Sequence, residues 1–249
     1  MRKVSAIIPT FNEAENIKKA IESVRFADEI IVVDSYSTDK TPEIATNLGV
    51  SVIQHEYVYS AAQKNWIIPQ VKHEWIFLLD ADEVASPMLL DEIQSILNKT
   101  EIEEDAFWIN RTNMFLGKPV KYSGWQRDKV IRLFKRDTCR YEDKHVHAEI
   151  ITGGKIGVLQ NRIIHYTYKS MDHYIKKMNQ YAIWKANQFH LSNKKPNLFH
   201  FIVKPIFRFI KNYFVDLGIL DGFRGLIICS LNAYGVFLRY AILLGLRKE

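Results

Sequence analysis

Cysteine is scarce in this sequence, which contains only Cys139 and Cys229. Two cysteines so far apart have neither the spacing of a zinc site nor the density of a disulfide-stapled secreted domain. A signal peptide is also not indicated, because the first apolar stretch is short and is interrupted at Pro9 and Asn12. We therefore expect a protein that is made and kept in the cytoplasm.

The glycine-rich loops of common nucleotide-binding proteins are missing as well. The sequence has no Gly-x-Gly-x-x-Gly fingerprint and no Gly-x-x-x-x-Gly-Lys-Ser/Thr loop. Apolar residues make up 47% of the 249 residues, which is enough for one globular domain with or without an appendage. The net charge of +6 suits phosphates, nucleic acid or an anionic membrane, and does not choose among them.

Strand and helix patterns alternate through the first hundred residues, which predicts a mostly parallel sheet with helices on both faces. Strands are expected at residues 4–9, 29–34, 51–54 and 75–80, and helices at 13–24, 41–48, 60–71 and 87–97. Asn12 is the expected N-cap of the first helix. Residues 106–168 contain short β-like runs, and the chain is helical again after residue 171.

Acidic residues follow two of these strands, where ligands bind in parallel sheets. Asp80 and Asp82 are two apart after the fourth strand, so both carboxylates can reach one Mg²⁺ or Mn²⁺ ion. The alternative is an acidic cluster that caps the next helix. Asp34 ends the second strand and can accept hydrogen bonds from a base or ribose, although residues 34–39 could equally form an ordinary Asx/Ser turn.

Four motifs in chain order make the sequence resemble the inverting family-two glycosyltransferases with the GT-A fold. They are Ile8-Pro9-Thr10-Phe11-Asn12-Glu13-Ala14-Glu15-Asn16-Ile17, Val33-Asp34-Ser35 with Ser37-Thr38-Asp39, Ala62-Gln63-Lys64-Asn65, and Asp80-Ala81-Asp82-Glu83. The resemblance implies an α/β fold, with a GT-A type nucleotide-binding mixed sheet flanked by helices. It covers residues 1–170 as the catalytic domain, and leaves 171–249 as a helical, membrane-associating extension.

Later motifs are similar to the branch that adds glucose to the inner core of bacterial lipopolysaccharide. They are Arg132-Leu133-Phe134, Val146-His147, Ile164-His165-Tyr166-Thr167-Tyr168, and Leu220-Asp221-Gly222-Phe223-Arg224-Gly225-Leu226.

The family resemblance also implies a donor site for a nucleotide-sugar, with a UDP-sugar favoured, and a divalent cation, Mn²⁺ or Mg²⁺. The implied nucleotide-binding residues are Pro9, Thr10, Asn12, Glu13, Asp34, Asp39, Lys64 and Asp80. The implied metal ligands are Asp82, Asp80 and His165, with Asp82 favoured. Without the family, each histidine would be read as a structural hydrogen-bonding residue.

A carboxylate must act as general base on the acceptor hydroxyl, and Glu149, Asp143 and Glu142 are the candidates. Ala148 stands where the family often has an acid, so the choice among the three stays open. Trp125, Gln126, Arg127 and His147 are expected at an acceptor or phosphate site. For the segment at 125–127, a plain β-turn with an exposed arginine is the alternative.

The C-terminal segment combines positive charge with apolar faces. Residues 196–249 contain seven Lys/Arg and three Asp/Glu. Basic and apolar side chains separate at helical spacing over residues 204–217, which is typical of a helix in a membrane interface, although a packed helix would give the same pattern. Residues 225–246 are long enough to span a bilayer, but Asn232 and Arg239 interrupt them, so we expect an in-plane or protein-packed hairpin.

The resulting hypothesis is an inverting hexosyltransferase that moves a hexose, glucose favoured, to a lipid-linked saccharide such as lipopolysaccharide core. We expect it to be peripheral on the cytoplasmic face of an anionic membrane. The expected partners are the donor, the acceptor and the membrane, but not nucleic acid, and a homo-oligomer stays open. Two alternatives stay open. One is a nucleotidyltransferase acting on a sugar phosphate. Such enzymes usually carry a basic, glycine-rich loop after the first strand, and residues 11–16 do not resemble one. The other is a non-catalytic membrane adaptor.

Overall fold

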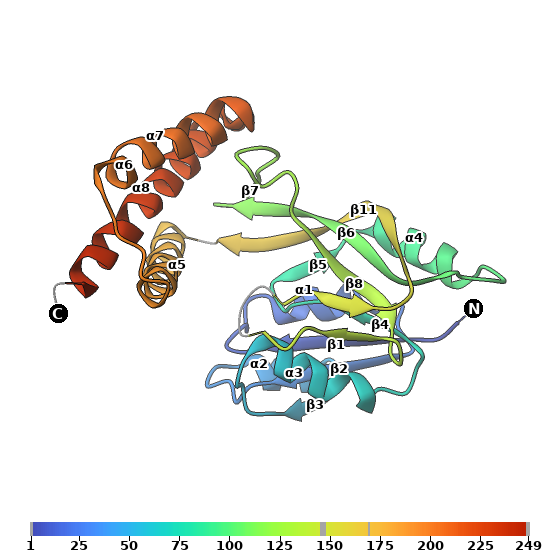
Figure 1. Cartoon of the computed structure of the whole chain (residues 1–249). Helices are drawn as coiled ribbons and strands as arrows, with labels where there is room; N and C mark the ends of the chain where they lie inside the picture. Colours follow the sequence, from blue (N-terminus) through green and yellow to red (C-terminus); the bar gives the residue numbers. More distant parts are fainter. Residues whose placement is uncertain (1, 145–147, 169, 248–249) are drawn as a thin grey trace. The chain divides into compact units, whose positions relative to one another are not determined.

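The computed structural model describes residues 2–144, 148–168 and 170–247 (Figure 1). The chain forms two compact units. The first comprises Met1–Arg111 and Asp128–His165, and the second comprises Thr112–Arg127 and Tyr166–Glu249. The sequence predicted one division after residue 170, whereas the compact units place residues 112–127 with the C-terminal helices.

Most of a mixed sheet lies in the first unit, in the order β3-β2-β1-β4-β8-β6-β11-β5. The ends of β6 and β11 belong to the second unit, and so does β7, which pairs with the end of β6. The strands are β1 (Val4–Thr10), β2 (Glu29–Asp34), β3 (Ser51–Gln54), β4 (Trp75–Leu78), β5 (Glu83–Ala85), β6 (Glu104–Phe115), β7 (Lys118–Pro119), β8 (Lys129–Lys135) and β11 (Lys155–Tyr168). Strands β1 to β4 are parallel, as the sequence predicted, and β8 joins β4 in antiparallel orientation. Two further strands, β9 (Cys139–Tyr141) and β10 (Ile150–Thr152), form a separate antiparallel pair.

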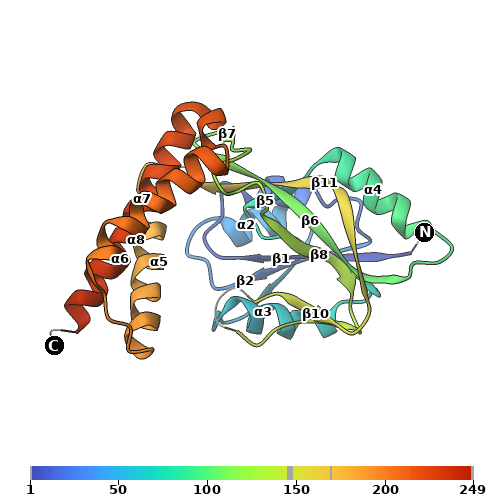
Figure 2. The same cartoon turned by 45° about the horizontal axis from the view of Figure 1, so that its top comes forward.

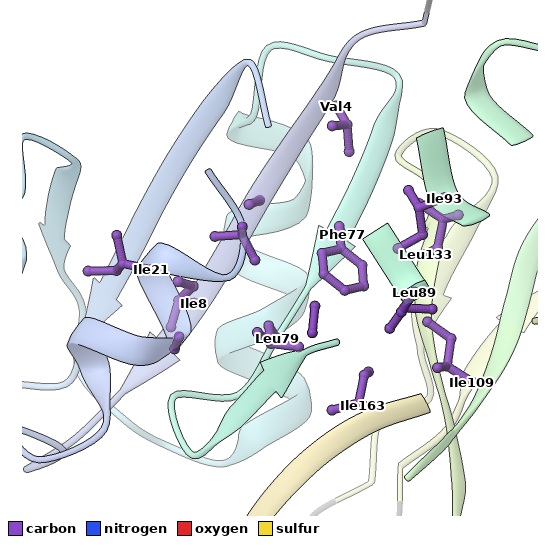
Figure 3. Packing of buried hydrophobic residues seen from close by; sticks show 14 of the residues in the cluster. Val4, Ile8, Ile21, Phe77, Leu79, Leu89, Ile93, Ile109, Leu133 and Ile163 are labelled. Atoms are coloured by element: carbon purple, nitrogen blue, oxygen red, sulfur yellow. The ribbon is translucent and has the colours of Figure 1, made fainter. Parts of the chain in front are cut away.

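Side chains of β1 alternate between two apolar layers, because successive residues of a strand point to opposite faces. Val4, Ala6 and Ile8 pack with helices α1 (Ile17–Glu22), α2 (Thr41–Asn47) and α4 (Pro87–Leu97). Ile7 packs on the other face with α3 (Ser60–Ile67), which continues as a 3₁₀ turn, η1 (Ile68–Gln70). Figure 2 shows α3 and α4 on opposite sides of the sheet, and Figure 3 shows the first layer around Phe77. Each fully buried Ile, Leu or Phe of these layers stabilises the fold by roughly 1.5–3 kcal/mol.

The first helix begins later than the sequence predicted. Its N-cap is Asn16, whereas Asn12 has a φ of 53° in the left-handed region that asparagine tolerates. The Asn12 N–H donates to Ser37 Oγ at 2.8 Å, and its Oδ1 accepts from the Thr38 N–H at 2.8 Å. The prediction of Asn12 as a helix cap is therefore wrong, because its side chain instead ties together the loops that follow β1 and β2.

The second unit is mainly helical, although it also includes β7 and the ends of β6 and β11. It contains α5 (Met171–Leu191), α6 (Leu198–Phe201), α7 (Val203–Ile210), a π-helical turn η2 (Lys211–Val215), a 3₁₀ turn η3 (Gly218–Asp221) and α8 (Gly222–Leu246). Helices α5, α6 and α7 pack along α8, as Figures 1 and 2 show. The amphipathic stretch expected over residues 204–217 is split between α7 and the π-helical turn, and ends at Val215.

Asp221 holds the loop before β8 against the start of α8. Its carboxylate accepts from the N–H groups of Lys121 and Tyr122, at 2.9 and 3.0 Å, and from the Ser123 hydroxyl at 2.7 Å. At Gly225, an added Cβ would lie only 1.8 Å from the carbonyl oxygen of Gly218, so this position accepts no side chain. The Leu220–Leu226 motif thus contains residues that the packing of this unit requires.

Candidate active site

A cavity of about 200 Å³ opens at the carboxyl ends of β1, β2 and β4. This is the edge of the sheet where parallel strands place their ligands. Its lining residues are Pro9, Thr10, Phe11, Glu13, Ser35, Tyr57, Ser60, Gln63, Lys64, Asp80, Ala81 and Asp82. The structure therefore brings together six of the predicted donor and metal residues, and Asn12, Asp34, Asp39 and His165 are not among those that line the cavity.

Two buried polar atoms at this edge have no hydrogen-bond partner among the described residues. They are Thr10 Oγ1 and Asp34 Oδ1, from residues paired in register across β1 and β2. The other oxygen of Asp34 accepts from the Ser37 N–H at 3.0 Å and from Gln54 Nε2 at 3.5 Å. Because an unsatisfied buried polar atom costs free energy, such a pair is expected where a ligand supplies the missing partners.

Asp39 organises the loop after β2. Its carboxylate accepts from the Ala14 N–H at 3.1 Å and from the N–H and hydroxyl of Thr41. Burial tends to raise the pKa of Asp39, but the hydrogen bonds from Thr41 and Ala14 outweigh it and lower the pKa. Its side chain is thus engaged in holding the loop. The Asp34–Ser37 hydrogen bond is likewise of the turn type that the sequence left as an alternative.

Asp80 is held between two cations. One carboxylate oxygen lies 2.9 Å from Lys64 Nζ, and the other contacts the guanidinium of Arg132. Burial opposes ionisation of Asp80, but the charges of Arg132 and Lys64 outweigh it and keep the pKa of Asp80 far below its usual range. Asp80 is therefore ionised, and both its oxygens are already paired.

Asp82, which lines the cavity, lies beside His165. His165 Nε2 lies 3.3 Å from Asp82 Oδ2. The contact arises because β11 pairs with β5 so that His165 is opposite Glu83, the residue after Asp82. A carboxylate oxygen beside an imidazole nitrogen is a donor set that Mn²⁺ accepts. In the described part of the chain, no group of three or more His, Cys, Asp or Glu is arranged to hold a metal ion.

A buried ion-pair network beneath this site was not predicted. Arg132 is 3% exposed and contacts Glu83 Oε1 at 2.8 Å as well as Asp80. Glu83 is fully buried and also pairs with Arg111 at 3.1 Å, and Arg111 pairs with Asp128 at 2.7 Å. A signal was available in the sequence, since Arg132 interrupts the apolar run of β8 and a buried cation requires an acidic partner.

The candidate general bases lie around β9 and β10. Asp143 accepts a hydrogen bond from the hydroxyl of Tyr59, the residue before the cavity-lining Ser60. Glu142 Oε2 accepts from Lys144 Nζ at 2.8 Å, and this bond is the main cause of its lowered pKa. Glu149 has an exposed side chain. None of the three carboxylates lines the cavity of the first unit.

Three of the four residues expected to contact the acceptor or a phosphate lie in one pocket. Trp125, Gln126 and Arg127 line a second pocket, which lies within the C-terminal unit. His147 lies outside the described residues.

Comparisons with known proteins agree with this architecture. Residues 5–163 match the model of glycosyl transferase family 2. An uncharacterized glycosyltransferase of Rickettsia bellii is 31% identical, over 96% of this chain and 85% of the relative. The lipopolysaccharide core biosynthesis glycosyltransferase LpsC of Rhizobium meliloti is 27% identical, over 96% of this chain and 93% of the relative.

Among solved structures, residues 1–349 of S. aureus TarS in complex with UDP superpose with a TM-score of 0.50 at 17% identity, covering 99% of this chain and 91% of that one. This likeness is one of fold, and it confirms the predicted fold class.

Replacement of Arg132 tests the buried network. We expect Arg132→Met to lower the free energy of unfolding by about 3–5 kcal/mol, because Glu83 and Asp80 then keep buried charges without their shared partner. Urea unfolding followed by circular dichroism measures the change. In the wild type, the stabilisation from Asp80 should decline as the pH falls below about 4, since its pKa is lower in the folded chain than in the unfolded one.

Lys155→Met is the matched control, since it removes a cation of the same unit from an exposed ion pair with Glu103. Exposed pairs contribute little, so its unfolding midpoint should stay at the wild-type value. Equal midpoints for the two variants would contradict a stabilising role for the network.

Proposed function

The chain belongs to glycosyl transferase family 2, and we propose that it transfers a hexose, glucose favoured, from a UDP-sugar to a lipid-linked saccharide. The observation that carries this proposal is the cavity at the ends of β1, β2 and β4, which is lined by Thr10 with its unsatisfied hydroxyl and by Asp82 beside His165. The unsatisfied oxygen of Asp34 is buried at the same edge of the sheet. The UDP bound by TarS supports the donor class, and the name of LpsC supports lipopolysaccharide core as the acceptor class.

Asp34 is suited to select uracil. A carboxylate oxygen without a donor requires an N–H, and the N3–H of uracil supplies one, whereas cytosine presents a lone pair at the same position. The hydroxyl of Thr10, at the paired position on β1, can donate to a carbonyl oxygen of the same base. Uracil would supply hydrogen bonds to both Asp34 and Thr10, so UDP would bind more tightly than CDP. Cytosine would leave the Asp34 carboxylate oxygen without a donor.

The two aspartates at the end of β4 have separate roles in this proposal. Asp80 is neutralised by Lys64 and Arg132, and it fixes the turn that directs Asp82 toward the cavity. Asp82 and His165 are the residues that would hold Mn²⁺ or Mg²⁺, with the donor's diphosphate oxygens as further ligands. When bound, such an ion would stabilise the charge that develops on the departing UDP.

The acceptor hydroxyl attacks the anomeric carbon, its oxygen forms the new glycosidic bond, and the bond to UDP breaks. The proton of the hydroxyl passes to a carboxylate of the segment between β9 and β10. Asp143 and Glu149 rank ahead of Glu142, because the hydrogen bond from Lys144 stabilises the Glu142 anion and makes it a weaker base. A single displacement of this kind inverts the configuration of an α-linked donor and gives a β product.

A peripheral position on the cytoplasmic face of an anionic membrane fits the surface of the C-terminal unit. Large apolar side chains are exposed along residues 198–226, with Phe223 at 83% and Leu198 at 72%. Residues Gly218–Leu246 are long and apolar enough to cross a membrane by length and composition. Asn232 and Arg239 in the same stretch favour a helix that lies in the interface.

Loss of the Asp82 carboxylate tests the metal and donor proposal. Asp82→Asn should lower hydrolysis of UDP-glucose and transfer from it by about 10²–10³-fold, and EDTA should do the same to the wild type. Asp91→Asn, which replaces an exposed acid of α4, is the control and should keep full turnover. Full turnover of Asp82→Asn, or no effect of EDTA, would refute the proposal.

The anomeric configuration of the product tests the displacement. Proton NMR of the product from UDP-α-glucose should give the large coupling of a β-glucoside, and an α product would rule the mechanism out. Amide replacement of the true base, Asp143→Asn or Glu149→Gln, should lower turnover by at least about 10²-fold while UDP binding is kept. Glu142→Gln should have the smaller effect.

A further inference from the structure

A second pocket of about 360 Å³ lies entirely within the C-terminal unit. Three chain segments build it: the loop at residues 123–127, the end of α7 with the π-helical turn η2, and the middle of α8. Four cationic side chains line it, Arg127, Arg208, Lys211 and Arg239. The one acidic residue in its lining is Asp216.

This single acid is already neutralised. Lys211 Nζ lies 2.7 Å from Asp216 Oδ2, so the pair leaves the three arginines uncompensated. Within the residues that the structure describes, none of these three guanidinium groups forms an ion pair with a carboxylate. A pocket of this composition is suited to an anion that carries more than one negative charge.

Arg239 gives the clearest indication that the pocket binds an anion. It is only partly exposed, and its Nε donates to the carbonyl of Gly235 at 3.3 Å, which leaves its two terminal nitrogens for other acceptors. Burial is the main cause of its lowered pKa, and the neighbouring charge of Arg208 adds to it. Like charges held together in a partly desolvated place are unfavourable unless an anion joins them.

The loop that forms the pocket wall is fixed before any ligand arrives. Asp221 anchors its start, and the Ser123 N–H donates to the Asp216 carbonyl at 3.2 Å. The Gly124 N–H donates to Gln126 Oε1 at 2.9 Å, and Gly124 has a φ of 88°, which disfavours any side chain there. A prearranged wall lowers the ordering cost of binding.

The surroundings of the pocket indicate where its anion comes from. Ile206, Phe207 and Ile210 are exposed on α7, the helix that carries Arg208, and Phe214 is exposed on the π-helical turn that carries Lys211. A soluble anion would make no contact with these apolar side chains, whereas a membrane lipid carries a phosphate for the arginines and acyl chains against which apolar side chains can pack.

We propose that this pocket binds the phosphomonoester group of a membrane lipid, with Arg208 and Arg239 as its principal ligands and Arg127 at its rim. The proposal rests on the membrane location proposed above, but not on the identity of the donor or of the transferred sugar. It gives the C-terminal unit a specific lipid partner, in addition to general attraction to an anionic surface.

Vesicle co-sedimentation of the full chain tests the proposal. The vesicles are phosphatidylcholine mixed with phosphatidic acid or with phosphatidylserine, adjusted to the same zeta potential. The wild type should bind phosphatidic acid vesicles about tenfold more tightly than phosphatidylserine vesicles. The double variant Arg208→Gln/Arg239→Gln should lose this preference, since guanidinium pairs are specific for phosphate geometry whereas diffuse attraction depends on charge alone.

The matched control is Lys176→Gln/Lys195→Gln, which removes two exposed charges of the same unit outside the pocket and should keep the preference for phosphatidic acid.

Arg127→Gln is a second pocket variant, and it changes an exposed side chain. It should weaken the preference even if the double variant fails to fold. An equal loss in pocket and control variants, or no preference in the wild type, would overturn the proposal.

Two further measurements distinguish a lipid phosphate site from a site for a soluble anion, and separate the lipid proposal from the donor proposal. Calorimetric binding of inorganic diphosphate that depends on Arg208 and Arg239, without a preference for phosphatidic acid, would assign the pocket to a soluble anion and overturn the lipid assignment. UDP binding, measured on the same samples, should be equal in wild type and pocket variants. A wild type that prefers phosphatidic acid but does not bind UDP would contradict the proposed donor and leave the lipid site standing.

Discussion

The burial of Arg132 is the constraint on which the first unit depends. A guanidinium that is 3% exposed is tolerable only because Asp80 and Glu83 lie against it, and each of these acids is held in turn by a second cation, Lys64 or Arg111. The network joins the end of β4 to β5, β8 and β6, and thereby ties parallel strands to antiparallel ones. It fixes the turn at residues 80–82, from which the chemistry of the cavity follows.

This constraint explains how two aspartates only two residues apart can differ in role. Asp80 has both oxygens paired and a strongly lowered pKa, so it acts as a fixed charge within the protein. Asp82 lines the cavity and lies beside His165, which is on β11. Thr10 Oγ1 and Asp34 Oδ1, at the paired ends of β1 and β2, are buried without a hydrogen-bond partner among the described residues, and the proposed donor would satisfy both.

The sequence predicted those features that depend on local pattern. Apolar runs identified β1 to β4, and the acids after them identified the cavity edge. It could not predict that Asn12 adopts a left-handed conformation, because that depends on hydrogen bonds to Ser37 and Thr38 in a separate loop. The partners of Arg132 also escaped local reasoning, since they come from the turn after β4 and from β5. Which acid is the general base stays a prediction for a similar reason, as it depends on an acceptor.

The proposed function assigns the donor to the first unit and a lipid phosphate to the second, and its central claim is that Asp82 and His165 hold the cation beside the donor diphosphate. Pulsed electron paramagnetic resonance of Mn²⁺ with UDP and the protein tests this claim most directly. The account predicts a ¹⁴N coupling from the imidazole that appears only with UDP present and disappears in His165→Gln. A ¹⁴N coupling that survives in His165→Gln, or bound Mn²⁺ without any nitrogen coupling in the wild type, would contradict it.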